Sequence, residues 1–203
     1  MKEDILEQLA DDFLQFRGYF TMHNVKFRPQ ADHPEFISNQ DSNNSDIDVI
    51  GINPKLSGCD RVWAISCKSW QGGFRPSARI AKISSNGRVS GRDAWKGFRE
   101  LVMPKWAMAF RKTVSDLTGH HEFTYVTAVT KLHGDKCVWQ NHQPFLDTIQ
   151  APIKVVTLNE MLEEVWPSLN TTPAASDVGR TLQLIKASGW SPTPTPRPSK
   201  NGG

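Results

Sequence analysis

Long apolar runs, paired cysteines and a basic amino-terminal leader are missing from this sequence of 203 residues, and each absence excludes a class of protein. No apolar stretch approaches the roughly 18 residues that a membrane-spanning helix needs, so we expect no membrane partner. Residues 1–4 (MKED) lead directly into an amphipathic pattern, which is unlike a secretory signal peptide. We therefore expect a cytoplasmic protein.

Cysteine is too scarce to form a framework. Cys59, Cys67 and Cys137 are odd in number and never spaced as Cys-x-x-Cys, which argues against a set of disulfides and against a structural zinc site. His120 and His121 form the only close histidine pair, in a loop-like context, and we do not expect them to bind a metal.

Charge is small in total but unevenly distributed. The net charge is +3, yet residues 1–48 carry ten acidic and four basic side chains, and residues 68–112 carry eleven basic and two acidic ones. This asymmetry is typical of a protein with a surface for a polyanion, although a solvated basic face would give the same pattern.

Hydrophobic periodicity predicts one α/β domain with a mixed central sheet over residues 1–166. A helical stripe over 3–17 is followed by three expected strands, a long helix with a kink or break at Pro104, and a further strand. The expected strands cover 19–28, 46–53, 61–69, 122–131 and 153–157, and the later helices 93–115 and 159–165. The turn at 54–60 favours an antiparallel hairpin, and the helix before residue 122 allows a parallel crossover.

The remaining segments are interpreted as connections. Residues 29–45 and 71–92 are rich in turn-forming residues and are expected to be loops. Residues 167–190 are expected to form a linker and a C-terminal helix over 177–187, and the Pro-rich segment 191–203 is expected to be disordered.

Two charged residues stand where neighbouring strands should pair. If side chains alternate along 45–51 (SDIDVIG), Asp46 and Asp48 share one face, and Ile47 and Val49 share the other. By the same rule, Ser66 and Lys68 share a face of the next strand, while the side chain of Cys67 points away. Pairing of the two strands would therefore bring Asp48, Ser66 and Lys68 together.

A carboxylate and an ammonium group among apolar strands are costly to bury unless a ligand uses them. A divalent cation suits the carboxylate and a phosphate suits the lysine, which is the combination that phosphodiester hydrolysis needs. Asp48 would be the central Mg²⁺ ligand, with Mn²⁺ as a substitute, and the carbonyl of Cys67 could add a ligand. Lys68 would position the attacking water. The alternative is a strand-edge carboxylate and a solvated lysine without a ligand.

These residues resemble the PD-(D/E)xK superfamily of restriction-endonuclease-like nucleases. The matching segments are 45–51 (SDIDVIG) and, eighteen residues after Asp48, 66–70 (SCKSW). The segment 6–19 also resembles the first helix of Mrr-type restriction enzymes and Holliday-junction resolvases, in which a glutamate at the position of Glu7 joins the metal site. The resemblance covers roughly residues 5–131 and implies an α-β-β-β-α-β core.

One departure from the family bears on activity. The family usually has Glu or Gln where this chain has Ser66, so one acidic ligand is missing. Some members with serine there recruit a glutamate from the following helix as the second acidic ligand. Glu100 is the candidate for that role in this chain, and Asp46 is another. Glu7 lies off the apolar stripe of its helix, and a plain surface role for it, as for Glu100, stays open.

Basic residues after Lys68 supply a candidate nucleic-acid surface. Trp70, Phe74 and Trp95 are interleaved with them, either to stack on bases or to pack in the core. The cations are Arg75, Arg79, Lys82, Arg88, Arg92, Lys96 and Arg99.

The sequence therefore predicts a Mg²⁺-dependent nuclease that acts on DNA, an endonuclease by preference, with catalytic roles for Asp48, Lys68, Ser66 and Glu7. The alternative is a DNA-binding module that kept the fold but lost catalysis through Ser66. The state of assembly is open, a homodimer included.

Overall fold

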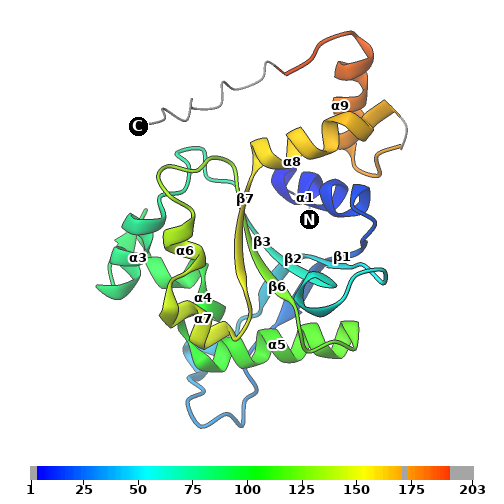
Figure 1. The fold of residues 1–203 in the computed structure, drawn as a ribbon. Helices are drawn as coiled ribbons and strands as arrows, with labels where there is room; N and C mark the ends of the chain where they lie inside the picture. Colours follow the sequence, from blue (N-terminus) through cyan, green and yellow to red (C-terminus); the bar gives the residue numbers. More distant parts are fainter. Residues whose placement is uncertain (1–3, 171–172, 193–203) are drawn as a thin grey trace, which may run out of the picture.

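The computed structural model describes residues 4–170 and 173–192, and its centre is a five-stranded mixed sheet with the strand order β1-β2-β3-β6-β7 (Figure 1). β1 pairs antiparallel with β2 and β2 with β3, whereas β3, β6 and β7 run parallel. The strands are β1 (Phe20–Phe27), β2 (Ser45–Ile52), β3 (Val62–Lys68), β6 (Thr124–Val129) and β7 (Ile153–Thr157). The predicted α/β class, the hairpin and the parallel crossover are confirmed.

Helices cover both faces of the sheet (Figure 1). On one face, α1 (Ile5–Phe16) and α8 (Leu158–Val165) pack through a cluster that includes Leu9, Val49 and Trp63. On the other face lie α3 (Pro76–Ser84), α4 (Arg99–Val102), α5 (Pro104–Thr118), α6 (Cys137–Gln140) and α7 (Gln143–Ile149). We call these the α1 face and the α5 face.

Three segments differ from the sequence-based expectation. The basic stretch 71–92, expected to be a loop, contains α3 and begins the small hairpin of β4 (Arg88–Val89) and β5 (Arg92–Asp93). The helix expected over 93–115 has its predicted break at Pro104, which occupies the first turn of α5 and ends the short α4, but its first part differs, because Ala94–Gly97 form a 3₁₀ turn. The short helices α6 and α7 were not expected, and each is one or two turns long.

The C-terminal part packs on the first helix. The α9 helix (Asp177–Ala187) has Ser176 as its N-cap, and the Ser176 hydroxyl also bonds the carboxylate of Asp12 on α1. The predicted disordered tail at 191–203 falls outside the described residues from 193 onward. In the described part of the chain, no helix is both long enough and apolar enough to cross a membrane.

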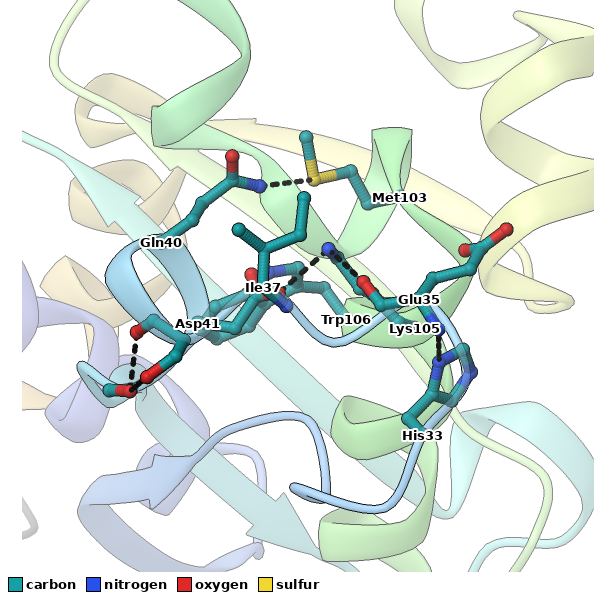
Figure 2. Close-up of polar contacts among 10 residues, drawn as sticks. His33, Glu35, Ile37, Gln40, Asp41, Met103, Lys105 and Trp106 are labelled. Carbon is teal, nitrogen blue, oxygen red and sulfur yellow. Dashed lines mark hydrogen bonds and ion pairs between the residues drawn. The ribbon is translucent and has the colours of Figure 1, made fainter.

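A buried ion pair anchors the loop between β1 and β2 to α5 (Figure 2). Asp41, in the short helix α2 (Ser38–Asp41), is 0% exposed and accepts from Lys105 Nζ at 2.7 Å and from Trp106 Nε1 at 3.0 Å. Lys105 also donates to the carbonyl of Glu35 at 2.8 Å. Burial acts to raise the pKa of Asp41, but these donors and the amide of Ile37 outweigh it and lower the pKa.

We predict that Lys105→Met lowers the free energy of unfolding by about 3–5 kcal/mol, because it leaves the Asp41 charge buried without its cation. Urea unfolding measures this loss. Lys112→Met is the control on the same helix: its pair with Asp116 is exposed, so it should cost less than about 1 kcal/mol. Replacing Asp41 by Asn in the Lys105→Met protein should recover part of the loss, and equal losses in the two lysine variants would contradict the prediction.

Candidate active site

The Asp48 carboxylate lies where β2 and β3 separate. The β2–β3 pairing runs from Ile52↔Val62 to Val49↔Ile65 and goes no further toward Asp48. Beyond that point the amide of Cys67 donates to Asp48 Oδ2 at 2.5 Å instead of to a main-chain carbonyl of β2. The Asp48 side chain therefore takes the place of the next rung of the ladder.

Burial dominates the electrostatics of Asp48, which is only 9% exposed. Burial raises its pKa; Lys68 and the Cys67 amide oppose the rise, and the charges of Glu7 and Asp46 add to it, which leaves the pKa at about 6. Burial thus leaves the charged form of Asp48 poorly solvated, which is a condition under which a nearby cation is stabilising.

Lys68 extends from the end of β3 over the α5 face. Its Nζ donates to Ser66 Oγ at 2.7 Å and lies 5.4 Å from the ring centre of Phe98. The sequence placed Ser66 and Lys68 on one face of their strand, and their side chains contact each other there. Cys67 packs toward the α1 face, and burial raises the pKa of its thiol well above the usual value, which disfavours the nucleophilic thiolate.

Two glutamates approach the site from opposite faces of the sheet. Glu7 lies in the first turn of α1 and is half-buried, and its charge raises the pKa of both Asp48 and Cys67. Glu100, in α4, is 5% exposed and accepts from the hydroxyl of Tyr125 at 2.5 Å. Glu100 is therefore a buried group at this end of the sheet, whereas Glu7 is partly exposed and acts on Asp48 and Cys67 through its charge.

Tyr125, which the sequence analysis did not single out, links Glu100 to Ser66. It is fully buried on β6, and burial together with the charge of Glu100 raises its pKa, while a hydrogen-bonding interaction with Ser66 acts in the opposite sense. The only sequence signal was its place in a strand of otherwise apolar residues and threonines. Its hydroxyl needs a polar partner once buried, and that need alone does not say which partner it finds.

Strict alternation fails at Asp48. The sequence placed Ile47 and Val49 on the same face, but Ile47 packs in the α5-face core and Val49 in the α1-face core. The carboxylate of Asp46 pairs with Lys26 Nζ at 2.8 Å, where both side chains are exposed. The expectation that Asp46 and Asp48 share one face of the strand is therefore wrong.

The basic residues divide into two groups. Arg79, on α3, stacks on Trp70 at 4.2 Å and lies 6.0 Å from the Phe98 ring that Lys68 also approaches, so it lies on the Lys68 side of α3. Others are engaged elsewhere: Arg88 and Lys96 pair with Asp93, and Arg99 stacks on Trp106 at 4.8 Å. The exposed members are Arg75, Lys82, Arg88, Arg92 and Lys96.

The tryptophans of this region are partly buried. Trp70 and Trp95 both pack against the α5-face core, as one of the two readings of the sequence required. Arg79 in addition covers the Trp70 ring, and Lys96 lies 5.5 Å from the centre of the Trp95 ring.

Few side chains at this site could hold a metal ion. Among the described residues, no three His, Cys, Asp or Glu side chains gather closely enough to hold an ion by themselves. Mg²⁺ keeps several waters and takes one or two protein carboxylates, so the residues that could hold it here are Asp48 and Glu7, whose charge acts on the pKa of Asp48. The same set does not fit zinc or calcium, which need more protein ligands.

We predict that Asp48→Asn stabilises the metal-free protein by about 2–3 kcal/mol at pH 8 and has little effect at pH 4, since one pKa unit corresponds to about 1.4 kcal/mol. A raised folded-state pKa gives stability that is present below the unfolded value of 3.8 and lost as the pH rises through about 6. Asparagine can still accept from the Cys67 amide.

Urea unfolding at both pH values in the presence of EDTA tests this prediction. Asp32→Asn, in the exposed part of the β1–β2 loop, is the control and should behave like the parent. A gain of the same size at pH 4 and pH 8, or a loss at pH 8, would show that Asp48 is not an electrostatically strained group.

Comparison with known proteins gives no family. No family model matches the sequence, and no curated protein matches it. One solved structure to which the chain is similar is described as a protein of unknown function, AF1548, at 9% identity, covering 92% of this chain and 79% of that one with a TM-score of 0.40. A similarity of that size supports no conclusion about fold or function.

Proposed function

We propose that this protein is a Mg²⁺-dependent nuclease that hydrolyses DNA phosphodiester bonds, with a restriction-endonuclease-like site. The observation that carries the proposal is the buried Asp48 carboxylate beside Lys68, at the point where two antiparallel strands separate. The second support is the set of α3 cations, with Arg79 on the side of the Lys68 end of the sheet.

The chain supplies distinct contributions to this reaction. Asp48 and Glu7, with the carbonyl of Cys67, would hold the magnesium ion, which provides Lewis acidity at the phosphate when bound. Lys68 orients the attacking water and offsets negative charge that develops on the phosphate. Ser66 accepts from Lys68 and thereby fixes the direction of the ammonium group.

The DNA backbone would lie along α3 and the β4–β5 hairpin. Arg75, Arg79 and Lys82 follow one another at helical spacing on one side of α3, so they can contact successive phosphates. The contribution of Arg88 and Lys96 requires their release from Asp93, to which both are bonded. Arg92 is exposed on β5, whereas Arg99 lies against Trp106 and serves the core more than the ligand.

A catalytically degenerate DNA-binding module is the second candidate. Its support is Ser66, a neutral residue at the position where the family carries an acid or amide, and the absence of a three-ligand cluster in the described part of the chain. Such a module would bind DNA through the same cations and leave it intact.

We predict that Lys68→Ala and Asp48→Asn each lower cleavage of plasmid DNA in Mg²⁺ or Mn²⁺ by about 10²-fold or more, while DNA binding in a gel-shift assay is kept. Asp48→Asn should bind as tightly as the parent or more tightly without metal, because the carboxylate repels phosphate. Lys55→Ala, in the exposed turn at the far end of the hairpin, is the matched control and should cleave like the parent. Cleavage that survives in both site variants would exclude this site, and a parent that binds but never cleaves would favour the module.

We also predict that Glu7→Gln raises the Mg²⁺ concentration for half-maximal cleavage by about tenfold, because one carboxylate alone gives the ion a single full charge. Glu100→Gln should have the smaller effect on the metal requirement, since Glu100 is held by Tyr125. A Mg²⁺ titration of both variants decides between them. If Glu100→Gln shows the larger shift, the acid from α4 is the second ligand, and if neither shifts, the account of the metal site is wrong.

A further inference from the structure

A matched irregularity runs through β1 and β2 at the level of Asp48. In β1, Met22, Val25 and Phe27 pack on the α5 face, although Met22 and Val25 are three residues apart and should lie on opposite faces. In β2, Ile50 and Ile47 are likewise three apart and both belong to the α5-face core. Side chains normally alternate between the two faces along a strand, and in each of these strands that alternation is interrupted once. We call this interruption the change of phase.

The opposite face shows the same change. His23 bonds Asp11 of α1 at 3.3 Å, and Thr21 accepts from Gln15 of α1 at 3.3 Å, so both point to the α1 face. Val49, paired with His23, also packs on the α1 face. The change of phase thus falls between His23 and Val25 in β1 and between Val49 and Ile47 in β2.

One residue of each strand lies between those two pairs: Asn24 in β1 and Asp48 in β2. Asn24 has φ of 51°, the left-handed region, which is foreign to a strand and which asparagine tolerates better than most residues. The pairing on either side keeps the same register, so the left-handed turn at Asn24 changes the faces without shifting the ladder. The effect on side-chain direction is that of a β-bulge.

We propose that Asn24 is a positioning residue for Asp48. Its left-handed backbone lets both strands change phase at one level, and Asp48 is thereby the residue of β2 that is committed to neither apolar core. Its carboxylate is free to occupy the gap beside β3 and to accept the amide of Cys67. The catalytic consequence rests on the proposed nuclease function, whereas the geometric one does not.

The packing explains why the irregularity persists. An extended Asn24 would turn Val25 and Phe27 to the α1 face and remove Phe27 from Trp106 and Phe110, whose ring centres lie 5.8 and 5.2 Å away. It would also break the match with Ile47, which pairs with Val25. The two cores therefore hold Asn24 in a conformation that the strand itself disfavours.

The test compares Asn24→Val, Asn24→Ala and Asn24→Gly by hydrogen exchange of the Cys67 amide and by DNA cleavage. Valine disfavours positive φ most, alanine less, and glycine adopts it freely. In Asn24→Val the Cys67 amide should exchange about tenfold faster relative to global unfolding, as expected for loss of a charge-assisted hydrogen bond. Cleavage should fall about 10²-fold through misplacement of Asp48. Asn24→Gly should keep both properties, and Asn24→Ala should fall between.

Gln150→Val is the matched control, because Gln150 has φ of 56° at the exposed C-cap of α7, away from the site. It should lose stability through the same backbone effect while the Cys67 amide stays protected. The proposal is overturned if Asn24→Val leaves that amide unchanged, or if Asn24→Gly behaves like Asn24→Val. If the parent cleaves no DNA, the nuclease proposal fails, and the Cys67 amide still decides the role of Asn24.

Discussion

The hydrogen bond from the Cys67 amide to Asp48 organises this end of the molecule. It replaces a main-chain rung between β2 and β3, so the two strands can part without leaving a buried amide unsatisfied. The cost is a carboxylate that is 9% exposed and whose pKa is raised to about 6. The separation of the strands and the strained acid are therefore two aspects of one arrangement.

Acidic groups reach that point from both layers of helices. Glu7 approaches from α1 and acts on the charge of Asp48, whereas Glu100 approaches from α4 and is held by Tyr125. The strand edge alone offers one carboxylate, so a site for a cation at this place depends on how the two helices dock. Helix docking is a property of the cores, which is why large apolar residues far from the site, such as Trp63 and Trp106, matter to its geometry.

The strands of the sheet could be predicted well from the sequence, because runs of β-branched and aromatic residues between turn-forming residues determine strands locally. Residues 153–157 and 177–187, for example, were predicted with the limits that the structure shows. The change of phase at Asn24 and Asp48 could not be predicted from the sequence, because sequence patterns are interpreted by assuming strict alternation. The exception is imposed by the packing of both hydrophobic cores. Glu100 and the break at Pro104 were both predicted, but the docking of α4 and the contact of Glu100 with Tyr125 follow from tertiary packing.

The neighbours of Ser66 explain why a small neutral side chain fits at this position. The Lys68 ammonium donates to the Ser66 hydroxyl on one side, and the Tyr125 hydroxyl interacts with it on the other. A glutamate at this position would add a negative charge near Asp48, whose pKa is already raised by burial and, to a smaller degree, by the charges of Glu7 and Asp46. A short neutral side chain avoids that repulsion and still orients the lysine. The small residue on β3 is thus linked to the acid on α4, because the hydroxyl of Tyr125 interacts with both Ser66 and Glu100.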